Sequence, residues 1–183
     1  MKFQDLQNPL RIRQLSQNQS DIDLIQKLFD AAPKYFQAIQ RNPASTTEAE
    51  EALSVLPPNT SLEQKFNLGL FLNSELIGYA DIINGYPDDS FAYLGLLIFS
   101  EQLQRSGFGK SAFALIEQLI SSWTTVKTIR LGVADANDVT GFWKKMGFTP
   151  TGRILPCHQQ QIKAQIIEME KPVRRAGQKG LTC

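Results

Sequence analysis

The chain has 183 residues and a mass of 20.5 kDa, the size of one domain with a substantial hydrophobic core. Hydrophobic residues make up 42% and charged residues 20%, with 12 Gly and 9 Pro, which excludes disordered and collagen-like chains. The net charge of +1, from 19 basic and 18 acidic side chains, gives no support to a nucleic-acid partner.

No apolar run approaches the roughly 20 residues of a membrane-spanning helix, and the first 15 residues lack the apolar stretch of a signal peptide. We therefore expect a cytoplasmic protein without a membrane partner. Two cysteines provide no disulfide framework, and no Cys-x-x-Cys or His-x-x-x-His spacing predicts a metal site. The charge is uneven, because residues 1–100 carry 7 basic and 12 acidic side chains whereas residues 101–183 carry 12 and 6. A basic C-terminal half can receive an anionic ligand.

The chain begins with a predicted strand and two predicted helices. Leu10–Leu15 alternates between polar and apolar residues, as a short strand does. Ser20 or Asp21 is expected to cap a helix with apolar residues at helical spacing, and Pro33 is expected to end it. A capping-box pattern at Thr47–Glu50 predicts the start of a second, short helix.

A three-stranded meander follows. Phe66–Leu72 and Leu76–Ile83 are predicted to form a hairpin, because Asn73–Ser74 between them suits a tight turn. Phe91–Phe99 (FAYLGLLIF) is almost continuously apolar, which is typical of a strand buried on both faces.

The second half is more strictly patterned. An apolar stripe predicts a helix that begins near Gly107, and alternation at Ile129–Val133 predicts a strand. Val139–Met146 has the spacing of a short helix ended by Gly, and Phe148–Arg153 and Ile162–Met169 are predicted as the last two strands. We expect a single domain over residues 1–172, followed by a basic, flexible tail over residues 173–183.

The loop before the second-half helix has the features of an anion site. A strand that feeds a Gly-rich loop into a helix leaves several N–H groups of the helix N-terminus without partners, which suits a phosphate or pyrophosphate. Gly107 and Gly109 let the backbone approach such a ligand, and Arg105 and Lys110 add positive charge.

Two common phosphate-binding motifs fit this loop poorly. Gly109–Ser111 resembles the end of a P-loop, but Gln104 stands where that motif requires its first Gly. Gly107–Ala112 fits the Gly-x-Gly-x-x-Ala of dinucleotide-binding folds, but the acidic ribose partner expected about 20 residues later is missing.

The loop fits a third pattern better. Gln104–Gly109 resembles the Gln/Arg-x-x-Gly-x-Gly/Ala loop of the GCN5-related N-acetyltransferase (GNAT) family, and Ala136–Phe148 (ANDVTGFWKKMGF) is similar to the family's second signature. The order of the earlier elements also follows the family, so the resemblance covers roughly residues 10–170. It implies a mixed α/β (α+β) fold of the acyl-CoA N-acyltransferase type, with a largely antiparallel, splayed sheet flanked by helices.

The same resemblance implies how acetyl-CoA, the expected cosubstrate, is bound without a metal. The cofactor would lie between the strands at 91–99 and 128–134 as they part. The residues that the resemblance assigns to cofactor binding are Leu97, Ile98 and Phe99 along the pantetheine arm, Gln104, Arg105, Ser106, Gly107, Phe108, Gly109 and Lys110 at the pyrophosphate, and Asn137, Phe142 and Trp143 beside the arm or the adenine.

The chemistry of amide formation sets further requirements. An alkylammonium acceptor has a pKa near ~10 and must lose a proton before it attacks the thioester, which requires a base. Asp81, a strand carboxylate in an apolar run, is the first candidate, and Tyr86 is the second; the alternative is that Asp81 faces solvent on the open side of the sheet. A strand N–H near Ile98 or Phe99 is the natural donor to the oxyanion.

The acid that protonates the leaving thiolate is where the sequence departs from the family. Many members have a Tyr four residues before the Gly of the Gly-Phe pair, and here that position is Trp143, whose indole N–H is a poor acid. The remaining alternatives are Tyr79, Tyr86 or Tyr93, a water molecule, or a thiolate that leaves unprotonated.

The sequence thus predicts an N-acetyltransferase that moves an acetyl group from acetyl-CoA to a primary amine of a small molecule or peptide, directly and in a ternary complex. A non-catalytic acyl-CoA-binding sensor is the alternative, because Trp143 replaces the usual acid. A homodimer is compatible with both.

Overall fold

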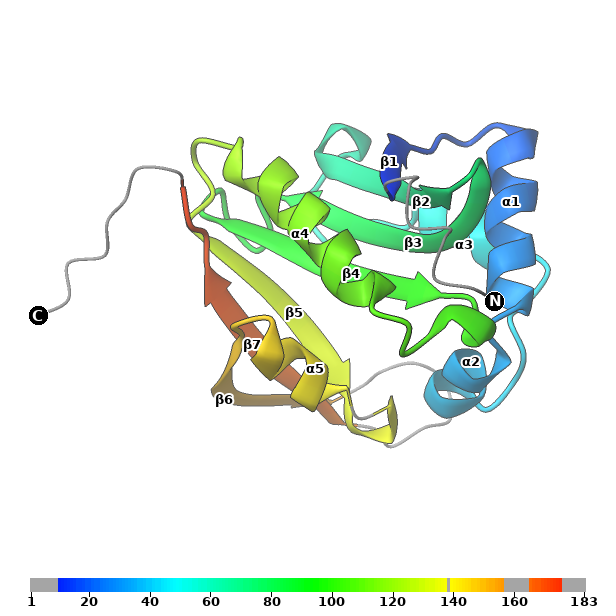
Figure 1. Cartoon of the computed structure of the whole chain (residues 1–183). Coiled ribbons are helices and arrows are strands. Elements are labelled where there is room, and N and C mark those ends of the chain that lie inside the picture. Colours follow the sequence, from blue (N-terminus) through cyan, green and yellow to red (C-terminus); the bar gives the residue numbers. More distant parts are fainter. Residues whose placement is uncertain (1–9, 138, 157–164, 176–183) are drawn as a thin grey trace, which may run out of the picture.

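A seven-stranded mixed sheet runs through the computed structural model, which describes residues 10–137, 139–156 and 165–175 (Figure 1). The strand order is β1-β2-β3-β4-β5-β7-β6, and every neighbouring pair is antiparallel except β4 and β5. The strands are β1 (Arg11–Gln14), β2 (Lys65–Leu72), β3 (Glu75–Asn84), β4 (Phe91–Phe99), β5 (Thr128–Ala134), β6 (Thr149–Pro156) and β7 (Gln165–Pro172). This is the largely antiparallel, helix-flanked sheet that the sequence predicts.

The helices cover both faces of the sheet. They are α1 (Gln19–Asp30), α2 (Pro33–Gln40), α3 (Glu48–Ser54), α4 (Phe108–Ser121) and α5 (Thr140–Lys145), with short 3₁₀ turns η1 (Leu62–Gln64), η2 (Glu101–Leu103) and η3 (Asp135–Asn137). In the described part of the chain, no helix is both long and apolar enough to cross a membrane.

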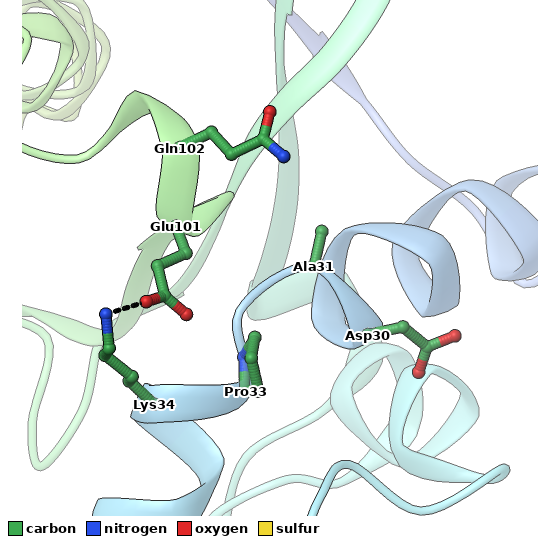
Figure 2. A pocket seen from close by; sticks show the side chains of 6 residues that line it. All are labelled: Asp30, Ala31, Pro33, Lys34, Glu101 and Gln102. Carbon is green, nitrogen blue, oxygen red and sulfur yellow. Dashed lines mark ion pairs between the residues drawn. The ribbon is translucent and has the colours of Figure 1, made fainter.

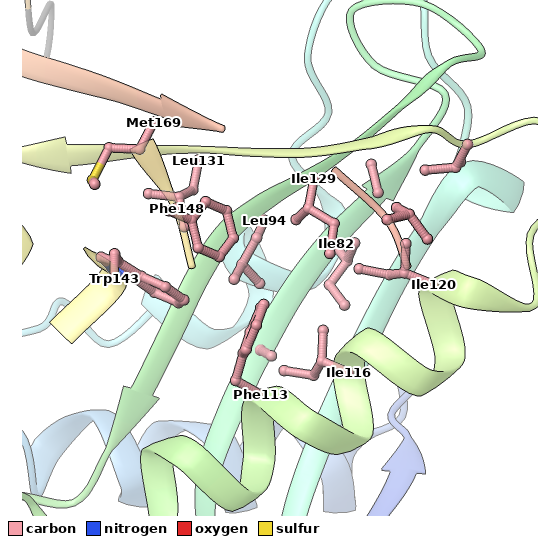
Figure 3. Close-up of a cluster of buried hydrophobic side chains, with 14 of the residues drawn as sticks. Ile82, Leu94, Phe113, Ile116, Ile120, Ile129, Leu131, Trp143, Phe148 and Met169 are labelled. Carbon is pink, nitrogen blue, oxygen red and sulfur yellow. The ribbon is translucent and has the colours of Figure 1, made fainter. Parts of the chain in front are cut away.

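The apolar stripe of α4 packs on one face of the sheet, as its spacing predicts. Phe113, Ile116 and Ile120 meet the inward residues of β3, β4 and β5, and α5 adds Trp143 to this cluster (Figure 3). On the opposite face, α1, α2 and α3 form a second cluster around Phe29, Phe36 and Tyr79. Alternation along each strand therefore decides which residues face α4 and which face away from it.

Three N-terminal expectations need correction. The α1 cap is Asn18, whose side chain accepts the Asp21 N–H, rather than Ser20 or Asp21. Pro33 does not terminate α1, which ends at Asp30, but opens α2, because a proline in the first helical turn loses no hydrogen bond. The predicted helix at α3 is present, but the Thr47 hydroxyl bonds the Glu51 carboxylate instead of capping the backbone.

The strand β4 is not buried on both faces as its apolar run predicts. Gly95 is exposed, and it forms a bulge, because Asp81 of β3 pairs with Leu96 and Ile82 with Leu94. A glycine inside a strand run is a signal of such a bulge. The bulge and the separation of β4 from β5 leave the middle of this strand accessible.

The packed chain extends at its C-terminal end to Arg175, beyond the predicted boundary at residue 172. Val173 is buried and donates its N–H to the Lys127 carbonyl, and Arg175 donates to three carbonyls in the segment between α4 and β5. Residues 176–183 and the start of the last predicted strand, 162–164, lie outside the described residues.

A buried carboxylate joins β1 to α1. Asp21 is 4% exposed and accepts hydrogen bonds from Arg13 at 2.7 Å, from the Ser16 N–H at 2.9 Å and from Asn18 at 3.0 Å. The Arg13 guanidinium is the main reason that the pKa of Asp21 is lowered from its usual range, with the Ser16 N–H also contributing.

Replacing Asp21 with Asn is expected to destabilise the fold by about 2 kcal/mol at neutral pH and to lower Tm by roughly 4–8 °C. Because the folded-state pKa lies below the unfolded value, this contribution is complete above the ordinary carboxyl range and is lost as the pH falls through the folded pKa. Thermal unfolding across this pH range tests the assignment. Asp23→Asn, whose carboxylate is exposed and accepts a hydrogen bond from Gln19, is the control with little expected change. A D21N penalty that persists at the lowest pH would contradict the electrostatic origin.

Candidate functional site

The site begins where β4 and β5 part. Their parallel pairing covers only Phe91–Leu94 with Thr128–Leu131, although β4 continues to Phe99 and β5 to Ala134. Figure 1 shows the two strands diverging beyond that point. The edge of β4 from Gly95 to Phe99 that faces β5 therefore has no strand partner among the described elements, and Leu97, Ile98 and Phe99 lie along it. Such an edge presents backbone groups to an extended ligand.

The predicted anion loop joins this edge to α4. Gly107 is the N-terminal cap of α4 with φ +88°, a conformation that favours glycine, and a Cβ there would meet no atom within 4 Å. In the described structure, no acceptor bonds the N–H groups of Gly107, Phe108 and Gly109. Arg105, Ser106 and Lys110 are exposed around them. The Gln104 side chain instead donates to the Phe99 carbonyl at 3.2 Å, which ties the loop to the end of β4.

Residues of the second signature, Ala136–Phe148, lie partly beside the loop and partly in the core. Phe142 of α5 lies against the first turn of α4, because a Cβ at Gly109 would be 3.2 Å from its ring. Trp143 is only 7% exposed, and its ring contacts those of Phe113 and Phe148 in the core (Figure 3). Asn137 ends η3, directly after β5, and is half-buried.

The face of the sheet away from α4 carries polar groups near the position where β4 and β5 separate. Asp81 alternates with Ala80 and Ile82, which pack toward α4, so its carboxylate lies on the opposite face. It pairs with the almost fully buried Lys65 ammonium at 2.8 Å, and a Cβ at Gly95 would lie 3.2 Å from its Oδ2. Burial raises the pKa of Asp81, and Lys65 only partly opposes this shift.

Tyr93 lies on this face as well. Tyr86 packs edge-on against it with ring centroids 5.6 Å apart. Arg130 of β5 is its cross-strand neighbour, with a guanidinium 4.0 Å from the Phe91 ring and a hydrogen bond to Glu170 at 2.7 Å. Burial is the main reason that the pKa of Tyr93 is raised. The structure therefore brings Asp81, Tyr86 and Tyr93 to one face beside the separating strands.

The hydroxyl of Tyr79 forms hydrogen bonds away from the gap between β4 and β5. It donates to Asn67 at 2.6 Å and lies 3.2 Å from the Ala52 carbonyl, beneath α3. Tyr79 is also fully buried, so it supports the fold rather than presenting a free hydroxyl to the gap.

The turn between α1 and α2 is attached to the segment that follows β4. The Glu101 N–H donates to the Ala31 carbonyl at 2.8 Å, and the Glu101 carboxylate pairs with Lys34 of α2. Both segments line a hollow of about 510 Å³. Figure 2 shows the Glu101–Lys34 pair among the side chains that line it. On its other side, α2 lies next to η3, near the open end of the gap (Figure 1). Sequence reasoning missed this role of Glu101, because an acidic residue in a loop carries no distinctive pattern.

Comparison with known proteins agrees with this geometry. The family model described as "Acetyltransferase (GNAT) family" matches residues 24–148. The chain belongs to the GNAT family. No protein of curated function matches it.

Solved structures share the fold. An acetyltransferase from Thermus thermophilus superposes with a TM-score of 0.69 at 23% identity, covering 90% of this chain and 97% of that one. A spermidine N-acetyltransferase from Vibrio cholerae, in complex with CoA and spermine, gives 0.68 at 16% identity, with 90% and 95% covered. An aminoglycoside 6'-N-acetyltransferase complexed with coenzyme A gives 0.65 at 17% identity, with 91% and 98% covered.

Membership of the GNAT family resolves the choice among phosphate loops. It supports acetyl-CoA as the cosubstrate, rather than a nucleoside triphosphate or a dinucleotide. The residue types present fit this ligand, since unpaired N–H groups and two cations surround the predicted pyrophosphate position.

Replacing Gly107 with Val is expected to weaken acetyl-CoA binding about tenfold or more, because a β-branched residue at positive φ displaces the N–H groups and obstructs the ligand. Isothermal titration with acetyl-CoA measures this loss directly.

Gly152 provides the matched control, because its φ is +85° and a Cβ there also meets no atom within 4 Å, but it lies on the exposed strand β6. Both variants should lose stability through backbone strain of about 1–2 kcal/mol. Only Gly107→Val should lose affinity, and unchanged binding in that variant would contradict the assignment of the loop.

Proposed function

We propose that this protein is an N-acetyltransferase that transfers the acetyl group of acetyl-CoA to a primary amine of a small molecule or peptide, directly and within a ternary complex. The observation that carries the proposal is the unpaired β4 edge leading into the N–H-lined loop of α4, in a chain of the GNAT family. The spermidine and aminoglycoside enzymes among the similar structures are amine acetyltransferases, which agrees with an amine acceptor.

The cofactor would lie between β4 and β5, with its pyrophosphate on the loop from Arg105 to Lys110. The pantetheine would pair with the β4 edge at Leu97, Ile98 and Phe99, and an N–H of that edge would donate to the oxyanion. Asn137 and Phe142, both half-buried, would line the rim of the gap, whereas a contact from Trp143 would require the pantetheine arm to reach into the core cluster.

The acceptor would approach from the face away from α4. Asp81 is the proposed base on this face, and Tyr86 is the second candidate. A carboxylate with a raised pKa is a stronger base for an ammonium proton than an ordinary surface carboxylate. The α2 helix next to η3 would form one wall of the acceptor site.

Thermal unfolding with acetyl-CoA, CoA, Mg-ATP and NADH, each alone, tests the proposal first. A ligand at about 100 times its Kd adds roughly 2.7 kcal/mol, which should raise Tm by about 5–10 °C for acetyl-CoA and CoA. No shift is expected with Mg-ATP or NADH. A shift with these two ligands alone would contradict the assignment of the loop.

Release of CoA thiol with a panel of primary amines then tests turnover. We expect amide formation with at least one amine of the panel. Binding of acetyl-CoA without turnover of any amine would instead favour the non-catalytic sensor. That alternative is based on Trp143, which is buried and stands where many family members have the tyrosine acid.

Asp81→Asn is expected to reduce kcat by about 10²-fold or more, while acetyl-CoA binding is retained. Because Asp81 must be ionised to accept a proton, kcat at saturating amine should rise with pH through its raised pKa, and this rise should disappear in the variant.

Lys65→Met provides the matched test, because Lys65 lowers the pKa of Asp81 and its removal should move the same rise to higher pH. If the rise of kcat occurs at the same pH in Lys65→Met as in the wild type, Asp81 is not the titrating base. A loss confined to Tyr86→Phe would assign that role to the second candidate.

A further inference from the structure

The position at which β4 and β5 separate contains two strand glycines, each facing one polar group. The last paired residues are Leu94 and Leu131, and the glycines follow immediately at 95 and 132. The Asp81 carboxylate lies over Gly95, as described above. A Cβ at Gly132 would lie 3.3 Å from the Tyr93 hydroxyl. The Tyr93 phenol therefore reaches across to β5 at the start of the gap, and the missing side chain at Gly132 makes room for it.

The other aromatic groups are less suitably placed. The Tyr79 hydroxyl is bonded to Asn67 under α3. Tyr86 precedes β4 and packs on the ring of Tyr93, so it lies toward the paired part of the two strands. Trp143 is in the core on the α4 face. Among the described residues, no hydrogen-bond acceptor is found for the Tyr93 hydroxyl.

We propose that Tyr93 is the general acid that protonates the departing CoA thiolate, in place of the family's usual tyrosine at the position of Trp143. This inference rests on the proposed function. The acceptor nitrogen, deprotonated by the base, forms the C–N bond, and the C–S bond then breaks. The sulfur takes the Tyr93 proton, and the phenolate regains one from the new amide nitrogen. One proton, accepted by the base, is released overall.

The surroundings of Tyr93 keep its hydroxyl protonated until the thiolate forms. Burial is the largest cause of its raised pKa, and Tyr86, Glu168 and Asp81 act in the same direction while Arg130 opposes them. At the start of the gap the Tyr93 hydroxyl lies against β5, 3.3 Å from the Cβ position of Gly132, so it can protonate a thiolate that forms there. Gly132 is accordingly a positioning residue, because any larger residue would press on the phenol and on Ile166.

The decisive experiment compares Tyr93→Phe with the wild type on two donors, acetyl-CoA and its selenoester analogue acetyl-seleno-CoA, in single-turnover measurements. A selenol is a far stronger acid than a thiol, so selenolate leaves without protonation. We expect Tyr93→Phe to slow transfer from acetyl-CoA by about 10²-fold. With the selenoester, its rate should fall by less than about threefold, because the general acid's contribution of about 10²-fold is no longer required.

Two control variants separate this role from indirect effects. Tyr79→Phe removes a hydroxyl that only supports the fold, so any loss should be the same with both donors. Asp81→Asn should remain slow with the selenoester, which shows that amine attack still governs the measured rate. Equal losses of Tyr93→Phe on both donors, or no loss on either, would overturn the role of Tyr93 and leave the acetyltransferase proposal intact. A wild type that acetylates no amine with either donor would overturn both.

Discussion

The interruption of hydrogen bonding in the middle of the sheet is the constraint on which the rest of the structure depends. An unpaired strand edge inside a fold is costly unless a ligand or water satisfies its polar groups. Here β4 keeps β3 on one side throughout, so the edge is held rigidly while its other side is open from Gly95 onward. The parallel segment from Phe91 to Leu94 anchors both strands, and the core cluster on the α4 face contains residues of both. A cofactor that pairs along this edge needs shape and backbone groups more than particular side chains.

This dependence on backbone explains which parts of the site the sequence reveals. The loop from Gln104 to Gly109 can be recognised because its glycines and the start of the helix that follows are local sequence signals. The strands and α4 can be recognised from the spacing of their apolar residues. The face of the sheet that we propose for the acceptor is not recognisable in this way. Asp81 and Tyr93 are 12 residues apart on different strands, and only the register of β3 on β4 and of β4 on β5 brings them to one place.

The errors at the N-terminal half have a common origin. Asn18, Ser20 and Asp21 are all residues that favour helix caps, so local preference cannot choose among them. The choice is made by the Arg13 contact from β1, which engages Asp21 as the buried anchor and leaves Asn18 as the cap. Pro33 is compatible both with the end of one helix and with the first turn of the next. The hydrogen bond from the Glu101 N–H to the Ala31 carbonyl fixes the turn after α1, so that Pro33 begins α2. In each case a contact distant in sequence selects among local alternatives.

That Glu101 contact also links the two halves of the proposed site. Its N–H holds the turn before α2, the helix proposed as one wall of the acceptor site, and its own segment leads directly into the loop proposed to receive the pyrophosphate. The backbone bond to Ala31 does not depend on the side chain at 101, whereas the ion pair with Lys34 does. The proposed wall of the acceptor site and the entrance of the proposed cofactor loop are thus both attached to Glu101, at the end of β4.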